Sequence, residues 1–539
     1  MDITAETFVF HLPRLLDDLA TCHFVSIDCE FSGIPTANTS PSSGKTTLQQ
    51  RYDEYRTCAD KYSIVQIGLT VGHEDTKKAT YTLRPYNLYL NPTIDQKLDV
   101  ERDICFQSSA MEFLLQNQFS LNSMYKDGVQ YLSREEADLA MTKAAARFNR
   151  TPSRTVLEIK ETEYDSIEFI AAARKLVKDW LALGKAREPY LNIPPPSGDA
   201  VRADSTMPST LNNYQKRLVH QLIEAEYPSL VTIGQPTFIQ IIDYDEEREK
   251  AVRDQRMKRA RERISKQIGF RWVAEALAGG DLSHLDPYCF RSTMSTSTAV
   301  KPQASLRQFS DKMKQKLQSH RPVLVGHNLL IDLVYFCRCF FGPLPDSVQD
   351  FQTMVHKMFP VLVDTKYLAT HQCGSIIPRS SLSEINETLL QTATPKIKIH
   401  HQHAKYNSRK SEHEAGYDSL LTAQVFIKLS AQLRDGGLSE TAEPSKPQRQ
   451  LQKESSQQKR IEPQETGLST RFDVLGIEEA GDVDGDLARE DEKAQRDEAS
   501  KKAGQGQLIP RSGNEFWQVY SNKLRVFGTE ESVCYVGQS

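Results

Sequence analysis

Two acids in an apolar run near the N-terminus have the spacing of a metal site. The run from Val25 to Phe31 is typical of a buried strand, and Asp28 and Glu30 lie two residues apart on it. Side chains two apart on a strand point to the same face, with Cα atoms about 6.6 Å apart. Such carboxylates repel each other in an apolar region unless a cation lies between them, and paired divalent metals commonly cut phosphodiesters. Taken alone, the pair is equally typical of a strand end whose acids face water.

A third acid follows another apolar strand. Residues 322–328 form a strand ending in a glycine-containing turn, and the pattern predicts an apolar helix over 329–341. Asp332 lies in the first turns of that helix, where an acid often only complements the helix dipole. Its neighbours Leu330, Ile331, Leu333 and Val334 are all apolar, which argues against idle exposure to solvent. Asp332 is therefore a candidate metal or substrate ligand.

A histidine and a fourth acid precede the last apolar helix of the pattern. On a continuous helix His413 and Asp418, five residues apart, would point about 140° away from each other. They converge only if His413 lies in a loop that folds back, a bend that Gly416 would allow. A histidine has an ordinary pKa near 6.5, which suits a general base that takes a proton from water at neutral pH.

The composition sets the broad class of protein. A chain of 539 residues predicts two or three domains, and its hydrophobic fraction of 39% predicts globular cores plus a polar, unpacked portion. The net charge of −4 excludes a wholly basic nucleic-acid coat but not a local basic groove. The nine cysteines lack a Cys-x-x-Cys pair, which indicates reduced thiols. We expect a soluble intracellular protein without a membrane partner, and both nucleus and cytoplasm are compatible with the sequence.

The element pattern predicts an α/β fold. A helix over 4–20 precedes the acidic strand, and strands over 63–69 and 80–83 follow it. This order suits a mixed sheet flanked by helices. We expect one catalytic domain, split between 1–150 and 321–433 by an inserted small α+β module and its flanking helices over 151–320. Its charged helix, over 245–266, is typical of a solvated face, with an RNA-facing or import role as the alternative. The composition of 434–508 predicts disorder, and 509–539 predicts a segment that docks on the core or on a partner.

Assembled, these acids spell Asp-x-Glu, a central Asp and His-x-x-x-x-Asp, a set that resembles the DEDDh class of 3′ exonucleases with a ribonuclease H-like fold. More closely, residues 31–34, 326–332 and 413–418 look like motifs of the poly(A)-specific ribonuclease family, and the resemblance covers about residues 1–430. It implies a 3′→5′ exoribonuclease that shortens the poly(A) tails of mRNA and releases 5′-AMP. Asp28, Glu30, Asp332 and Asp418 would hold two Mg²⁺ ions, with Mn²⁺ as a substitute, and His413 would be the base. The family also implies single-stranded RNA with a 3′ poly(A) end as substrate, and a homodimer.

Three further residues are candidate substrate contacts: Phe31, Asn328 and Lys366. Phe31 could pack inside or stack on a terminal base, and the sequence leaves both open. Lys366 closes a strand with Asp364, for which a structural or peripheral role is favoured over catalysis. A histidine-rich basic loop over 400–405 is interpreted as phosphate-facing or solvated rather than as a second metal site.

The insertion resembles the family's small nucleic-acid-binding module, which is defined by an Arg-x-x-x-His motif. Here Lys216 replaces the arginine four positions before His220, so packing or bracing of a dimer is at least as well supported as RNA contact. No RRM-like domain is recognisable after residue 430, and protein partners of the C-terminal tail stay open. Two other functions remain: trimming the 3′ ends of small non-coding RNAs, and a non-catalytic RNA-binding scaffold. The scaffold is disfavoured because binding RNA gains nothing from four clustered acids.

Overall fold

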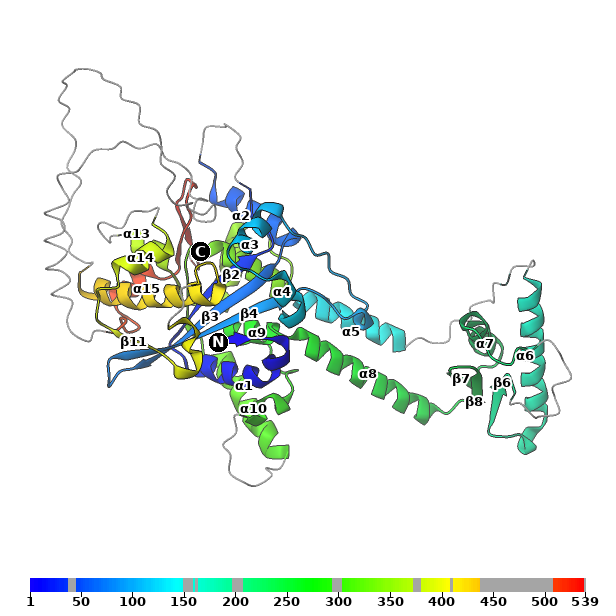
Figure 1. The fold of residues 1–539 in the computed structure, drawn as a ribbon. Coiled ribbons are helices and arrows are strands. Elements are labelled where there is room, and N and C mark those ends of the chain that lie inside the picture. The colour runs from blue at the N-terminus through cyan, green and yellow to red at the C-terminus, as the bar shows by residue number, and fades with distance from the viewer. Residues whose placement is uncertain are drawn as a thin grey trace, which may run out of the picture. The chain divides into compact units, whose positions relative to one another are not determined.

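The computed structural model describes residues 1–36, 45–148, 159, 163–195, 207–292, 303–371, 380–407, 411–436 and 508–537. The chain divides into two compact units (Figure 1). The first unit is Met1–Asp138 with Ser265–Ser539, and the second unit is Leu139–Ile264. Apart from residues 434–436, which end a helix, and residue 508, the segment predicted to be disordered lies outside the described residues. No helix among the described residues is long and apolar enough to cross a bilayer.

The second unit is smaller than the insertion predicted over 151–320. Residues 265–320 belong to the first unit. There α9 (Arg271–Ala278) and α10 (Gln303–Ser319) pack against α1 (Ala5–Thr21). The buried side chains of α9 include Trp272 and Val273, so this stretch is part of the first unit's core.

A mixed sheet forms the centre of the first unit, and the predicted α/β fold is confirmed. Its strand order is β1-β4-β3-β2-β9-β10. The central strand β2 runs antiparallel to β3 and parallel to β9, so it joins the antiparallel and parallel halves of the sheet. Strands β3 and β4 have 12 residues each and extend well beyond the lengths predicted from the sequence. The strands are β1 (Asp2–Ile3), β2 (Phe24–Phe31), β3 (Ile64–Asp75), β4 (Thr80–Asn91), β9 (Val323–Gly326) and β10 (Leu362–Asp364).

The helix α15 (Ala415–Gly436) lies across one face of this sheet, over β2, β3 and β4 (Figure 1). Phe24 of β2 meets Phe426 of α15 edge to face, with ring centroids 5.1 Å apart. The other helices and short strands of the first unit are α2 (Leu48–Lys61), α3 (Ser108–Gln116), α4 (Leu121–Asp127), β5 (Val129–Gln130), α11 (Leu330–Phe341), α12 (Val348–Met358), α13 (Thr365–Thr370), α14 (Leu382–Thr388) and β11 (Lys396–Ile399), while α5 (Arg134–Phe148) begins in it.

The C-terminal segment packs into the first unit. It contains α17 (Glu515–Tyr520) and the strand pair β12 (Lys523–Arg525) and β13 (Val533–Tyr535). Phe516 and Tyr520 are buried in the same apolar cluster as Phe426. Asn522 extends the edge of β10: its backbone N–H donates to the Leu362 carbonyl, and its Oδ1 accepts the Leu362 N–H at 2.8 Å.

The second unit has a core of its own. Its three-stranded antiparallel sheet has the order β6-β8-β7, and α6 and α7 supply most of the apolar cluster around Val177 and Leu222. In α8, which continues into the first unit, the basic residues of 258–263 are exposed, as expected of a solvated face. The elements are α6 (Tyr164–Ala182), β6 (Tyr190–Ile193), α7 (Asn213–Glu226), β7 (Leu230–Gly234), β8 (Ile239–Asp243) and α8 (Glu246–Ile268).

Candidate active site

Asp28 and Glu30 lie on β2, in the centre of the sheet. Both point to the face that α15 covers, since Ser26, two residues earlier, donates from its hydroxyl to the Ser419 carbonyl of that helix at 2.7 Å. Glu30 is only 6% exposed and Asp28 is partly buried. The apolar strand therefore carries two carboxylates under a helix, away from bulk water.

The start of α15 brings a third carboxylate to this face. Gly68 of β3 makes the close approach possible, because a Cβ atom there would lie 1.8 Å from the Ala415 carbonyl oxygen. Asp418, in the first turn of α15, thereby meets Asp28 and Glu30, and one carboxylate oxygen of each lies within 4.8 Å of the other two. Carboxylate oxygens are the ligands that Mg²⁺ prefers. Within the described part of the chain, this is the one group of acids, histidines or cysteines with the geometry to hold a metal ion.

The clustered negative charges of these carboxylates favour the binding of a cation. Burial raises the pKa of Asp28 well above its ordinary value, and the negative charge of Asp332 raises it further. Burial also raises the pKa of Glu30, and so do Asp28, Asp418 and Asp332. None of the ion pairs found among the described residues involves Asp28, Glu30 or Asp332. Because buried like charges repel, the donor set fits one or more divalent cations.

Asp332 lies beside this group but not within it. Strand β9 runs parallel to β2, so its carboxyl end, where α11 begins, lies at the end of β2 that carries the acids. Burial raises the pKa of Asp332 to about 8, although hydrogen bonds from the thiol and the backbone N–H of Cys29 act in the opposite direction. Asp332 is thus held by Cys29 and raises the pKa of Asp28 without joining the three-carboxylate group.

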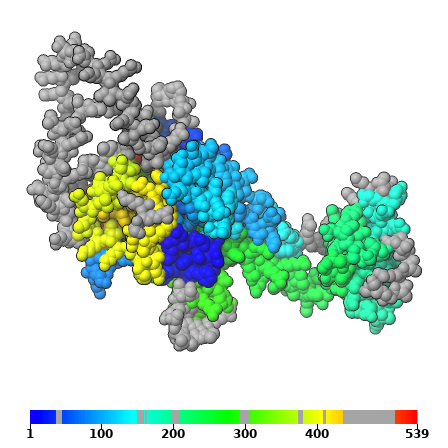
Figure 2. Space-filling model, in the orientation of Figure 1, coloured from blue at the N-terminus to red at the C-terminus, as the bar shows by residue number. Residues whose placement is uncertain are grey.

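His413 lies in a turn that immediately precedes α15, as the sequence argument required. The bend is at His413 itself, which has a φ of +62°, and not at Gly416. Gly416 is needed for packing, because a Cβ atom there would lie 2.5 Å from the Asn87 Cβ atom. The His413 N–H donates to Asp418 Oδ2 at 2.9 Å, and the imidazole packs edge-on against Phe113 of α3. In Figure 2 the light-blue and yellow segments, which lie far apart in the sequence, adjoin on one face.

Asn328 has the features of a ligand contact. It has a φ of +55°, a conformation that Asn tolerates better than most residues, and its N–H donates to Asp364 Oδ1 at 3.0 Å. Its own Oδ1 is buried and accepts no hydrogen bond from any residue that the structure describes. A buried acceptor without a partner costs stability, and a donor group of a bound molecule would satisfy it.

The structure favours packing for the other two predicted substrate contacts. Phe31 is 6% exposed, and its ring centroid lies 4.4 Å from the ring centroid of Tyr335. Lys366 is 5% exposed, with its ammonium group over the Phe527 ring and bonded to the Ser380 carbonyl. Asp364 accepts backbone N–H bonds from residues 328, 366 and 525, which identifies it as a structural residue.

The histidine-rich loop is also structural in part. His403 is fully buried, its Nδ1 lies 3.0 Å from the Pro85 carbonyl oxygen, and its ring packs on Tyr86. Burial lowers the pKa of His403 to about 3, so the side chain is neutral at physiological pH. A phosphate contact by this residue is therefore excluded, whereas His400 is partly buried and His401 is exposed.

Two buried amides that sequence reasoning missed contact the start of α15. Gln66 of β3 accepts the Ala415 N–H on its Oε1 at 3.0 Å, and Asn87 of β4 accepts the Gly416 N–H on its Oδ1 at 3.1 Å. The signal available in the sequence was a polar residue, Gln66, inside an otherwise apolar strand pattern. For Asn87 there was no local signal.

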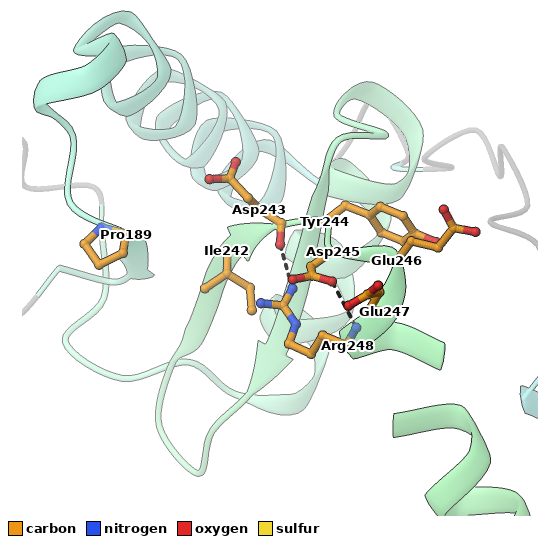
Figure 3. Close-up of a pocket in the computed structure, with 8 residues that line it drawn as sticks. All are labelled: Pro189, Ile242, Asp243, Tyr244, Asp245, Glu246, Glu247 and Arg248. Atoms are coloured by element: carbon orange, nitrogen blue, oxygen red, sulfur yellow. Dashed lines mark hydrogen bonds between the residues drawn. The ribbon is translucent and has the colours of Figure 1, made fainter. Parts of the chain in front are cut away.

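The second unit contains a pocket of a different character. It is lined by Pro189 and residues 242–248, of which four are acidic, and Arg248 donates from its side chain to the Asp243 carbonyl (Figure 3). An acidic lining repels phosphate groups. Elsewhere in this unit His220 bonds to the Thr232 hydroxyl at 2.6 Å, and the Lys216 ammonium group bonds to the Pro236 carbonyl. These contacts favour packing over RNA contact for the pair that replaces the Arg-x-x-x-His motif.

Comparison with known proteins shows several similar chains. An uncharacterized protein of Schizosaccharomyces pombe is 26% identical over 79% of this chain and 92% of its own length. The poly(A)-specific ribonuclease PARN of Xenopus laevis is 24% identical over 80% of this chain and 62% of its own length, so the chain spans less than two thirds of that relative. A pre-piRNA 3′-exonuclease trimmer of Bombyx mori is 23% identical over 80% of this chain and 71% of its own length.

A family model decides the classification. The model for the CAF1 family ribonucleases matches residues 3–426, a range that includes every acid of the candidate site and His413. This agrees with the resemblance inferred from the motifs, and homologues named as poly(A)-specific ribonucleases are among the similar chains. The chain belongs to the CAF1 family of ribonucleases.

Proposed function

We propose that this chain is a divalent-metal-dependent 3′→5′ exoribonuclease that shortens the poly(A) tails of mRNA and releases 5′-AMP. The observation that carries the proposal is the meeting of Asp28, Glu30 and Asp418 in a member of a ribonuclease family. Poly(A) as the substrate is supported by the names of several relatives, among them the Xenopus protein. Homodimerisation and residence in both nucleus and cytoplasm are further parts of the proposal, to be tested by analytical ultracentrifugation and by imaging.

Each residue of the site has a defined part in this chemistry. Asp28, Glu30 and Asp418, with Asp332 beside them, would hold two Mg²⁺ ions, for which Mn²⁺ could substitute. When bound, the metal supplies Lewis-acid stabilisation of the negative charge that develops on the phosphodiester oxygens. The imidazole of His413, held against Phe113, would take the proton of the attacking water. Asn328 would offer its Oδ1, which has no hydrogen-bond partner among the described residues, to a donor of the terminal nucleotide.

A second candidate is the removal of 3′ nucleotides from small non-coding RNAs by the same chemistry. It is favoured by the similarity to the Bombyx trimmer, which is nearly as great as that to the Xenopus protein. The two functions share the site and differ in the RNA that is accepted.

Labelled RNAs test both the chemistry and the substrate. The full chain is incubated with Mg²⁺ and RNAs of equal length that end in oligo(A), oligo(U) or oligo(C), next to Asp28→Ala. A deadenylase shortens oligo(A) fastest and releases 5′-AMP, whereas a general trimmer shortens all three at similar rates. Equal shortening of oligo(A) by wild type and Asp28→Ala would refute the assignment of the site, and no shortening by wild type would support the scaffold.

A further inference from the structure

Two rows of residues run across the sheet beneath α15. In one row, Asp28 of β2 pairs with Gly68 of β3, which pairs with Asn87 of β4. In the other, Glu30 pairs with Gln66. Side chains directly opposite each other on neighbouring strands point to the same face of a sheet. Asn87 and Gln66 therefore share a face and a register with the two acids of β2.

These two amides hold the first turn of α15. The first N–H groups of a helix lack intrahelical partners and must be satisfied by other groups. In α15 the N–H groups of Ala415 and Gly416 are accepted by Gln66 and Asn87, each of which is only 2% exposed. The contacts come from the sheet rather than from the helix itself, so they fix the helix start relative to β3 and β4. Gly68, between the two amides, leaves room for the helix backbone.

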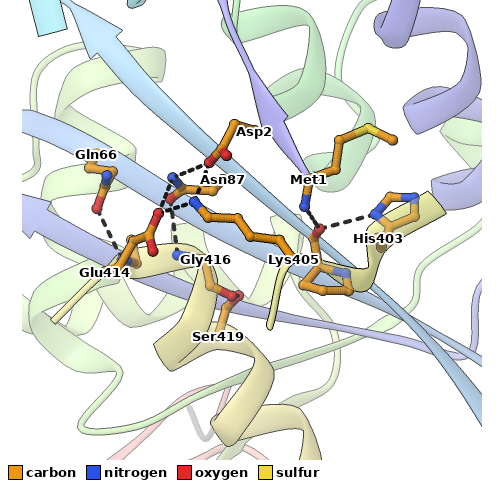
Figure 4. A network of polar contacts seen from close by, with 11 residues as sticks. Met1, Asp2, Gln66, Asn87, His403, Lys405, Glu414, Gly416 and Ser419 are labelled. Atoms are coloured by element: carbon orange, nitrogen blue, oxygen red, sulfur yellow. Dashed lines mark hydrogen bonds and ion pairs between the residues drawn. The ribbon is translucent and has the colours of Figure 1, made fainter. Parts of the chain in front are cut away.

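Charged side chains that contact Asn87 extend this hydrogen-bond network toward the surface (Figure 4). The Asn87 Nδ2 group donates to Glu414 Oε1 and to Asp2 Oδ1, both at 2.9 Å. The Lys405 ammonium group forms ion pairs with the same two carboxylates. Glu414 directly follows His413 in the chain. The turn that carries His413 is therefore fixed in two ways. The His413 N–H donates to Asp418, and the adjacent Glu414 contacts Asn87 and Lys405.

We propose that Gln66 and Asn87 are positioning residues of the reaction, which fix the start of α15 so that Asp418 stands against Asp28 and Glu30 and the turn with His413 keeps its place beside Asp418. This inference rests on the proposed function. Lys405 acts in the same way through Glu414. The rest of α15 is buried by its own apolar side chains, among them Leu421 and Phe426, so the helix has a separate source of stability. Loss of an amide should shift the first turn rather than unfold the helix.

The test compares Gln66→Met and Asn87→Leu with a matched control on the same helix, Lys428→Met, which removes a hydrogen bond to the Leu389 carbonyl far from the acids. Three quantities are measured on the full chain: Mn²⁺ affinity by electron paramagnetic resonance without RNA, kcat and KM on labelled oligo(A), and Tm without metal. Groups that support metal ligands typically contribute about 10–100-fold to metal affinity or activity. We expect losses of that size in Mn²⁺ affinity and kcat for both amide variants, with little change in KM. The control should lose Tm alone.

Lys405→Met provides a milder variant in case a buried substitution does not fold, since the Lys405 side chain is 22% exposed. It should lower kcat several-fold at unchanged KM. The inference is overturned if Gln66→Met, Asn87→Leu and Lys405→Met all match Lys428→Met in Mn²⁺ affinity and kcat. If wild type does not shorten RNA but the amide variants still bind Mn²⁺ more weakly than the control, the proposed function is wrong, whereas the positioning of the metal ligand Asp418 by the two amides is supported.

Discussion

Both units of this protein contain ion pairs near the surface, but among the described residues only the first unit gathers buried carboxylates into a cluster. In the second unit, charged side chains pair near the surface, as Arg174 does with Glu226 and Arg187 with Asp243, both at 2.6 Å. In the first unit, Asp28 and Glu30 are gathered under α15 and take part in no ion pair found among the described residues. Surface pairs contribute little to stability, whereas buried like charges destabilise a fold. A cluster of buried carboxylates that destabilises the fold therefore indicates a functional site, here one that binds a cation.

The largest effect that we predict separates activity from stability. Asp28→Asn keeps the shape of the side chain but removes a charge from the cluster. Hydrolysis of oligo(A) should fall by more than about 100-fold, the upper range for loss of a group that only supports a metal ligand. The Tm of the metal-free variant should rise, because Asp28 raises the pKa of Glu30 by repulsion that the substitution removes. Differential scanning calorimetry in EDTA measures the rise, and a lower Tm than wild type would show that no repulsion was relieved.

A core substitution in the second unit should have the reverse effect. Leu222 is fully buried in that unit's apolar cluster. Leu222→Ala should destabilise the unit by about 2–5 kcal/mol, as is usual for a buried Leu-to-Ala change. Hydrogen exchange of the α7 amides measures the loss. Mn²⁺ binding should stay at the wild-type level, since the candidate ligands belong to the first unit. Weakened Mn²⁺ binding would mean that the two units do not act independently.

The pH dependence of stability offers a smaller effect with a defined sign. The pKa of Asp332 is raised from 3.8 to about 8 in the folded protein, so the folded state binds this proton more tightly than the unfolded state. The resulting stabilisation is complete below the unfolded pKa and is lost as pH rises through the folded pKa. In EDTA, wild type should therefore lose stability relative to Asp332→Asn between about pH 4 and 8. Added Mg²⁺ should stabilise wild type most at high pH, since the metal competes with protons. Urea denaturation across this range tests both signs, and a flat difference would contradict them.

The smallest predicted effect lies on the surface of the second unit. Arg187→Ala breaks the ion pair with Asp243, whose side chain is 57% exposed, and removes the guanidinium from the Trp180 ring. We expect a loss below about 1 kcal/mol in urea denaturation. Asp243→Asn serves as a control that keeps the arginine on the tryptophan ring. A loss of several kcal/mol would contradict this expectation, because it would show that a surface ion pair contributes substantially to the stability of the second unit.

The sequence predicted what depends on local pattern. The acids of β2 were visible as breaks in an apolar strand, and the five-residue spacing of His413 and Asp418 required the turn that the structure contains. The roles of Gln66 and Asn87 could not be predicted, because they depend on which residues of β2, β3 and β4 stand opposite each other. Strand register is set by tertiary packing as well as by local pattern.

Other parts of the site depend on contacts between distant segments. The sequence left open whether Phe31 packs inside or stacks on a base. The structure shows its ring packed against Tyr335 of α11, a contact that the local sequence does not reveal. The C-terminal segment was recognised as ordered, but its bond from the Arg525 N–H to Asp364 joins residues 161 positions apart. Likewise, the thiol and backbone of Cys29 hold Asp332, which the pattern on α11 alone could not indicate.

The central claim is that carboxylates from distant parts of the chain form one metal centre. Crystals of the full chain grown with Mn²⁺ test it directly, because anomalous scattering locates the ion. The account predicts an anomalous peak among Asp28, Glu30 and Asp418, which disappears in Asp28→Asn. Saturating Mn²⁺ with peaks only elsewhere on the molecule would contradict it.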